Sequence, residues 1–154
     1  MQIRNLIYFL LPCTLIMPFI SSAFATPQQL SPVGLWYNID DHTGQPRAEI
    51  RITENDGVLT GSIQRSLSVD PSKEKTHCNK CTDDRKGQPL IGMEIIRGAR
   101  ISKDRWWEGG SILDPEIGKT YSLRLRVADD NQSLVVRGYI GPFFRSQTWY
   151  RATE

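Results

Sequence analysis

The residues best suited to chemistry lie in one stretch, THCNKCTDDRKGQPL, which runs from Thr76 to Leu90. Two residues separate Cys78 from Cys81, and His77 lies beside the first cysteine. Thiols and an imidazole can hold a metal ion, a pair of thiols can exchange electrons, and two cysteines can form a disulfide. The compartment and the fold that carry this stretch decide between these three kinds of site.

The first two kinds of site lack their usual setting. A closed structural zinc site takes four ligands, and only His77 and the distant His42 accompany the cysteines. A thioredoxin-like dithiol lies at a helix N-terminus beside a βαβ unit, whereas polar loop residues flank this pair. The stretch therefore favours a structural disulfide between Cys78 and Cys81, and we predict no metal and no cofactor.

The N-terminal segment has the features of a secretory signal peptide. Arg4 supplies a positive charge, residues 6–20 form an apolar run, and Ala23 and Ala25 place small residues before a cleavage site. Two prolines interrupt this apolar run, which is short for a membrane-spanning helix. We predict that residues 1–25 are removed by cleavage before Thr26.

The remaining chain, residues 26–154, is predicted to be a single domain that is periplasmic or secreted. The whole sequence has 19 basic and 17 acidic residues with no basic block, so no nucleic-acid partner is expected. No second apolar run follows, so no membrane span is expected after cleavage. An oxidising compartment favours the disulfide for Cys78 and Cys81.

The sequence after the leader predicts an all-β fold. Eight runs rich in β-branched and aromatic residues are bounded by Gly, Pro, Asn and Asp: 33–39, 46–53, 58–65, 90–98, 104–113, 120–127, 133–140 and 146–152. Most connections are short, which favours antiparallel pairing of consecutive strands. We predict an antiparallel up-and-down β-barrel of about eight strands, with a two-sheet sandwich as the alternative. The Ser66–Pro89 connection is long and is expected to be a solvated loop.

Two short motifs carry a resemblance. Gly34-Leu35-Trp36 on the first predicted strand and Arg151 on the last resemble the pattern of lipocalins and other calycins. In that family the tryptophan closes one end of the barrel and the arginine packs over its ring. The resemblance implies these roles for Trp36 and Arg151, and a cation over an indole is favourable by about 0.5–2 kcal/mol.

The chain from residue 34 to residue 151 also resembles a family of small exported bacterial proteins of unknown function with a lipocalin-like barrel. The matching stretches are GLWYNIDDHTGQPRAEIRI, CNKC followed by KGQPLIGMEII, GGSILDPEIGKTYSLRL, and RGYIG followed by TWYR. The resemblance implies the fold and export. It implies no activity.

An anion anchor is predicted on the seventh strand. Arg137 and Tyr139 are two residues apart and so share a face of the strand. They resemble the Arg-x-Tyr pair that holds a ligand carboxylate inside intracellular fatty-acid-binding barrels, where charge-assisted hydrogen bonds are strong. In the alternative arrangement Leu134, Val136 and Ile140 point inward, and Arg137 then lies outside.

The predicted function is non-catalytic binding of a small, mostly apolar ligand such as a lipid or fatty acid. Arg137, Tyr139, Trp107, Tyr121 and Trp149 are the predicted ligand-binding residues, although such aromatic residues more often belong to a filled core. The adjacent Phe143 and Phe144, placed in a loop before the last strand, could gate ligand access or touch a partner.

Two other functions remain open at this point. The chain could be an envelope interaction protein without a ligand cavity that uses the 66–89 loop as its contact surface; no protein partner can be named. An enzyme would need acids near the barrel mouth, and the candidates there are Asp40, Asp41, Asp114 and Glu116. No familiar catalytic motif is present, so the chain is predicted not to be an enzyme.

Overall fold

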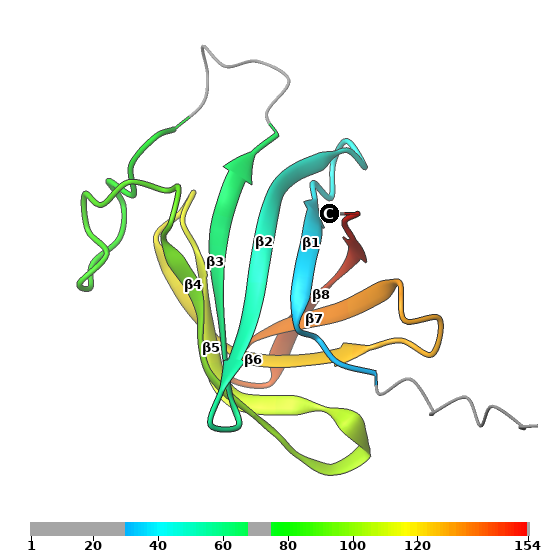
Figure 1. Ribbon diagram of the computed structural model, residues 1–154. Coiled ribbons are helices and arrows are strands. Elements are labelled where there is room, and N and C mark those ends of the chain that lie inside the picture. The colour runs from blue at the N-terminus through cyan, green and yellow to red at the C-terminus, as the bar shows by residue number, and fades with distance from the viewer. Residues whose placement is uncertain (1–29, 68–74, 154) are drawn as a thin grey trace, which may run out of the picture.

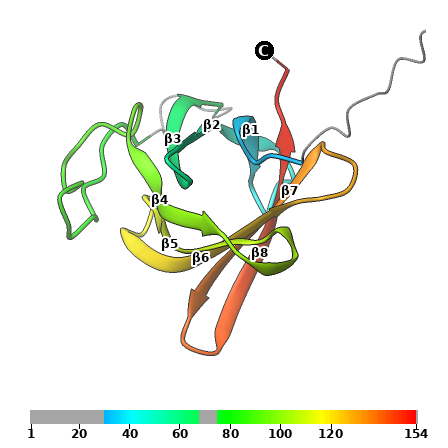
Figure 2. The ribbon, with the colours of Figure 1, turned by 60° about the horizontal axis from the view of Figure 1, so that its bottom comes forward.

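The computed structural model describes residues 30–67 and 75–153, which form a closed barrel (Figures 1 and 2). Eight antiparallel strands follow one another around the barrel in chain order, and β1 pairs with β8 to close it. The predicted up-and-down barrel is confirmed. The strands are β1 (Gly34–Ile39), β2 (Pro46–Asn55), β3 (Val58–Ser66), β4 (Glu94–Ile101), β5 (Trp107–Asp114), β6 (Lys119–Val127), β7 (Ser133–Ile140) and β8 (Phe143–Arg151).

Two N-terminal predictions concern parts of the chain that the structure does not describe. The predicted signal peptide, residues 1–25, and the predicted cleavage site before Thr26 lie outside the described residues. Within residues 30–67 and 75–153, no helix is long and apolar enough to cross a bilayer.

Side-chain alternation fills the barrel and fixes the register of its strands. Ile50 and Ile52 of β2, Leu123 and Leu125 of β6, and Leu134 of β7 are almost completely buried. Their neighbours along each strand point outward because successive side chains of a strand alternate between its faces. Burying each such side chain contributes roughly 2 kcal/mol, and a one-residue slip would expose all of them.

Two strands begin later than the sequence suggested. The β4 strand starts at Glu94 rather than residue 90, because Gly92 takes a positive φ of 85° in a turn that precedes it. The β5 strand starts at Trp107 rather than residue 104, because the short 3-10 segment η2 (Lys103–Arg105) comes first. Both differences arise from short turns just before the strands, which the residue pattern did not separate from the strands themselves.

The last strand begins earlier than expected. Ile140 of β7 pairs with Phe143 of β8, so the connection between them consists of residues 141 and 142 alone. Phe143 and Phe144 are therefore strand residues and do not form a loop, which corrects the predicted start at residue 146. The tight turn extends the β7–β8 hairpin and adds Arg145 to the regular alternation of β8.

One end of the barrel is closed around Trp36 and Arg151. The Arg151 guanidinium carbon lies 4.2 Å from the centre of the fully buried Trp36 ring, and the two residues pair across the β1–β8 seam. Burial lowers the pKa of the Arg151 guanidinium. A Cβ at Gly34, whose φ is 135°, would lie 2.8 Å from an Arg151 nitrogen. The glycine of the Gly-x-Trp motif therefore leaves room for this arginine.

Arg151 also joins three chain segments at that end. Its guanidinium donates to the carbonyl oxygens of Ser31 (3.1 Å), Val33 (3.2 Å) and Asn131 (2.8 Å). The first two carbonyls precede β1, and the third lies in the β6–β7 turn. The planar fork of an arginine suits several acceptors at once, which a lysine cannot reproduce.

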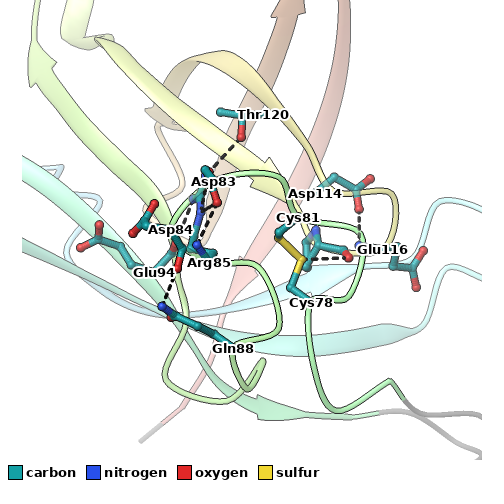
Figure 3. The surroundings of a disulfide bond; sticks show 11 residues. Cys78, Cys81, Asp83, Asp84, Arg85, Gln88, Glu94, Asp114, Glu116 and Thr120 are labelled. Atoms are coloured by element: carbon teal, nitrogen blue, oxygen red, sulfur yellow. Dashed lines mark hydrogen bonds and ion pairs between the residues drawn. A yellow bond between two sulfur atoms is a disulfide. The ribbon is translucent and has the colours of Figure 1, made fainter.

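The opposite end carries the disulfide loop (Figure 3). Cys78 and Cys81 are bonded to each other and almost completely buried, so the predicted disulfide is confirmed. The loop rests on the β5–β6 turn. A Cβ on Gly118 would lie only 2.0 Å from the carbonyl oxygen of Lys80, and such close approach requires glycine at position 118.

A buried arginine attaches this loop to the barrel. Arg85, only 3% exposed, forms an ion pair with Asp83 and donates to the carbonyl of Glu94 and the hydroxyl of Thr120, each at 3.1 Å. Hydrogen bonds from the Arg85 side chain and backbone lower the pKa of Asp83 to about 2. The described part of the loop, from Lys75 onward, is thus packed on the barrel by its charged residues, where the sequence suggested only solvation.

Removing the Arg151 side chain should destabilise the barrel. In Arg151→Ala the carbonyls at the closed end lose their charged donor and Trp36 loses its cation, so the free energy of unfolding should fall by about 2–4 kcal/mol. Denaturant unfolding followed by Trp fluorescence measures this loss. Arg151→Lys should restore only part of it, and full restoration by lysine would contradict the role given to the guanidinium fork.

The attachment of the disulfide loop should depend on pH in a defined window. The folded-state pKa of Asp83 lies below its unfolded value near 4, so the stabilisation is present above about pH 4 and disappears as the pH falls toward 2. NMR amide shifts of Arg85 and Gly87 should titrate with a midpoint near 2, and Asp83→Asn should abolish this transition. A midpoint near 4 would show that the ion pair does not hold the loop.

Candidate functional site

A cavity of about 930 Å³ opens at the end of the barrel that carries the disulfide loop. In an antiparallel meander, alternate connections lie at the same end, so the β1–β2, β3–β4, β5–β6 and β7–β8 connections all surround this mouth. The described part of the β3–β4 connection contributes Lys75, Thr76, His77 and residues 89–91 to the wall. The disulfide therefore stiffens a segment that borders the opening.

The floor of the cavity is apolar. Its side chains come from seven strands, β2 to β8, and are mostly buried. These floor residues are Ile50, Ile63, Ile95, Ile112, Leu113, Tyr121, Val136 and Trp149. Gly138 lies among them, and a Cβ there would approach the Cβ of Tyr121 to 3.2 Å, so this glycine makes space for the tyrosine. Such a floor suits a hydrocarbon chain.

Polar groups gather near the mouth on β8. Arg145 donates to Asp41 of the β1–β2 loop at 2.7 Å, and the Gln147 side-chain amide donates to the same carboxylate at 3.0 Å. The Gln147 oxygen lies 3.4 Å from both the Trp149 indole nitrogen and the Asn38 amide nitrogen. The inward face of β8 thus leads from a charged group at the rim to a buried indole at the floor.

The electrostatics of this group keep the guanidinium charged. The hydrogen bond that Arg145 donates to Asp41, together with the negative charge of that carboxylate, raises the pKa of Arg145 above its already high usual value. Arg145 therefore presents a permanent cation to the mouth, although Asp41 occupies part of its hydrogen-bonding capacity. A guanidinium of this kind can bind a carboxylate or phosphate through paired hydrogen bonds.

A second ion pair spans the opening. Arg47 of β2 contacts Glu116 of the β5–β6 turn, and both line the cavity. The two elements are not neighbours in the strand order, so the pair bridges opposite sides of the barrel. Both side chains are partly exposed, which limits its contribution to stability.

The carboxylates proposed for acid–base work are engaged in turns. Asp40 accepts hydrogen bonds from the Thr43 backbone and hydroxyl and from the His42 backbone, and these bonds lower its pKa. Asp114 accepts from the backbone nitrogen of Glu116 at 3.0 Å. Among the described residues no group of three His, Cys, Asp or Glu side chains lies close enough to hold a metal ion.

The structure brings together only part of the predicted ligand-binding set. Tyr121 and Trp149 line the cavity. Trp107 points inward and is buried in the core, but it does not line the cavity wall. Trp36 and Arg151 lie together at the closed end, well away from the mouth.

Arg137 and Tyr139 are on the outside of the barrel, which corrects their predicted place in the cavity. Val136 and Gly138, their neighbours on β7, line the cavity, so the alternating residues must face outward. Arg137 lies 4.9 Å from the centre of the Trp106 ring, and Tyr139 packs against Phe144 at 5.4 Å. The outward arrangement, weighed as the alternative for Arg137, is the one observed.

Arg145 and Gln147 are the inward polar residues that the sequence reasoning missed. The Gly141-Pro142 dipeptide is typical of a loop, and a last strand that begins at residue 146 leaves residue 145 in that loop, whereas β8 begins at Phe143. The missed signal is the spacing of Arg145, Gln147 and Trp149, since an inward tryptophan places the two preceding alternate residues on the same face.

Comparisons with known proteins agree with this architecture. No curated protein matches the chain. One similar solved structure is described as "Protein HP1028 from the human pathogen Helicobacter pylori belongs to the lipocalin family". It aligns with a TM-score of 0.66 and 14% sequence identity, over 79% of this chain and 83% of that one. At this identity the likeness concerns the fold.

The family is established by the sequence itself. The matching region, residues 34–151, begins at the first residue of β1 and ends at the last residue of β8, so it covers the whole barrel. It includes the closing pair, the disulfide and every strand that lines the cavity. This chain belongs to the bacterial family described as "Uncharacterized protein conserved in bacteria (DUF2147)".

Proposed function

We propose that this protein binds a small, mostly apolar ligand, such as a fatty acid or another single-chain lipid, without catalysis. The observation that carries the proposal is the cavity of about 930 Å³ with an apolar floor and a polar mouth. Its volume falls within the range of small-molecule sites. The lipocalin-family description of the similar solved structure supports binding in the same kind of barrel.

The arrangement of the walls suggests the orientation of the ligand. A hydrocarbon tail would lie on the floor near Ile50, Ile112 and Trp149, where its burial contributes about 0.8 kcal/mol for each CH₂ group. An anionic head would remain near Arg145 at the rim and compete with Asp41 for the guanidinium. The tail therefore goes in first, and the head stays near solvent.

The compartment belongs to the same proposal. A bacterial family, a buried disulfide and the signal-like leader of residues 1–25 together support a periplasmic or secreted protein. Such a protein would carry or sequester its ligand outside the cytoplasm. The engagement of Asp40 and Asp114 in turns supports a binding role over an acid–base one.

A contact role for the 66–89 loop is the second candidate. The observation that favours it is the loop itself, whose described part stands to one side of the barrel in Figure 1 and is fixed by the disulfide and Arg85. A rigid exposed loop loses little conformational entropy when a partner binds it. This role does not require the cavity to be occupied.

Ligand binding is tested by lipid extraction and titration. The purified protein should release lipid into organic solvent, and after delipidation a fluorescent fatty acid should bind saturably. Ala48→Phe, which places a ring in the cavity wall, should weaken binding. The absence of both extracted lipid and saturable binding would reject the cavity role and leave the loop as the better candidate.

The head-group contact is tested by Arg145→Ala. Loss of a charge-assisted hydrogen bond of about 1.5–3 kcal/mol should weaken fatty-acid binding about tenfold or more, while a fatty alcohol should bind about as before. Asp41→Asn should tighten binding of the acid by removing its competitor. The matched control is Arg137→Ala on the outer face, which should leave the affinity unchanged; equal effects of the two variants would remove Arg145 from the site.

A further inference from the structure

The mouth of the barrel carries an unusual amount of exposed apolar surface. Among the described residues eight large hydrophobic side chains are exposed, and five of them lie on the connections and strand ends around the mouth. The most exposed are Phe143 (78%), Phe144 (57%) and Ile140 (55%), which share the β7–β8 hairpin. Ile117 comes from the adjacent β5–β6 turn, and Ile91 from the β3–β4 connection across the mouth. The three hairpin residues are grouped by the pairing of Ile140 with Phe143, and exposed apolar surface of this kind is typical of interaction sites.

The strands behind this hairpin tip are strongly basic. The sequences of β6, β7 and β8 contain six Lys and Arg residues and no Asp or Glu, although the net charge of the whole chain is only +2. Arg124, Arg126 and Arg137 occupy outward positions on β6 and β7. Only Arg124 forms an ion pair, with Glu108 at 2.6 Å; among the described residues Arg126 and Arg137 have no carboxylate partner.

The three arginines are grouped around one aromatic ring, that of Trp106. Arg124 faces Arg137 directly across the β6–β7 ladder, an arrangement that is unfavourable for like charges. The Trp106 ring lies 4.8–4.9 Å from the guanidinium carbons of Arg124, Arg126 and Arg137 and so offsets part of the repulsion. A negatively charged surface placed against these strands would offset the rest.

The apolar tip and the basic face are continuous. Along β7, Arg137 lies three residues before Ile140, a separation of about 10 Å along an extended strand. Tyr139, packed on Phe144, lies between them. Apolar side chains of interfacial segments reach about 5–10 Å below lipid headgroups, so insertion of Phe143 would place Arg137 at the headgroup level. In Figure 2 the β7–β8 hairpin extends beyond the ring of strands.

From this arrangement we infer that the β7–β8 hairpin docks the barrel on an anionic lipid bilayer. Phe143, Phe144 and Ile140 enter the interface, and Arg124, Arg126 and Arg137 contact anionic headgroups. The complementary charge of the basic face selects a membrane with anionic lipids over a neutral one. Docking turns the cavity mouth toward the bilayer, and it holds whether or not the cavity carries a lipid.

Vesicle sedimentation tests the docking. The protein and all its variants are expressed from the full-length sequence and differ only at the substituted positions, so differences between them report on the barrel. Binding should be seen with phosphatidylcholine vesicles that contain phosphatidylglycerol, and it should weaken as salt is added. Phe143→Ser with Phe144→Ser should reduce the partition coefficient about tenfold or more, because two large apolar side chains are lost.

The arginines are tested in the same assay. Arg126→Ala and Arg137→Ala should each reduce partitioning about fivefold, the effect of one cation near an anionic surface. The matched controls lie at the closed end: Ile101→Ser, whose side chain is as exposed as Phe144, and Arg105→Ala should bind as the unaltered protein does. All the altered side chains are at least partly exposed, and near-UV circular dichroism checks that each variant folds.

Three results would overturn the inference. Equal partitioning of the tip variants and the controls would show that the hairpin does not dock. Equal binding to vesicles with and without phosphatidylglycerol would remove the role of the arginines. Retention on a soluble polyanion without any vesicle binding would assign the basic face to another ligand. If the Ala48→Phe variant loses fatty-acid affinity but still sediments with vesicles, the docking and the ligand role are separated.

Discussion

The closed end of the barrel is built around the guanidinium of Arg151. Of the eight strand pairings, the β1–β8 seam is the shortest, and it is the one that turns an open meander into a closed cylinder. Arg151 lies on that seam, covers Trp36 and binds carbonyls of the segment before β1 and of the β6–β7 turn. Because the closed end is sealed in this way, the opposite end can remain open without exposing the core.

The open end is organised by different forces. Arg85 and the disulfide hold the β3–β4 connection on the outside of the barrel, so that this connection borders the mouth and leaves the interior free. Polar groups from Arg145 to Gln147 then line the upper cavity, and apolar side chains line the floor. The barrel therefore has a filled core at the end closed by Arg151. It has an amphipathic cavity at the other end, where the β3–β4 connection packs on the outer surface.

Sequence reasoning recovered the architecture because the architecture depends on local signals. Alternating faces, such as that of Leu123 and Leu125, and turns rich in Gly and Asp repeat along the whole chain. The candidate site was harder to predict because it depends on which of the two alternating faces of a strand points into the barrel. Arg137 and Tyr139 share one face of β7 in both possible orientations of the strand. Only the burial of Leu134 and Val136 shows which face is inside. The inward position of Arg145 was not predicted because the connection before β8 has only two residues, 141 and 142.

Other features could not have been found in the sequence at all. Arg85 lies in a run of charged residues that is typical of solvated loops, yet it is among the most buried polar residues described. Its acceptors, the Glu94 carbonyl and the Thr120 hydroxyl, come from β4 and β6, which the pairing of both strands with β5 brings close together. Long-range contacts of this kind depend on the three-dimensional arrangement, and no pattern along the chain predicts them.

In the binding role proposed above, the Arg47–Glu116 pair would give the cavity an adjustable width. Because the two side chains meet from opposite walls, a slender molecule can pass beside them, whereas a molecule with a broad cross-section must separate them. Separation of a partly exposed pair costs only about 0–1 kcal/mol, so the pair would disfavour bulky ligands without excluding them. Dissolved salt weakens the ion pair further. The range of ligand widths that the cavity could accept would therefore depend on the ionic strength of the solution.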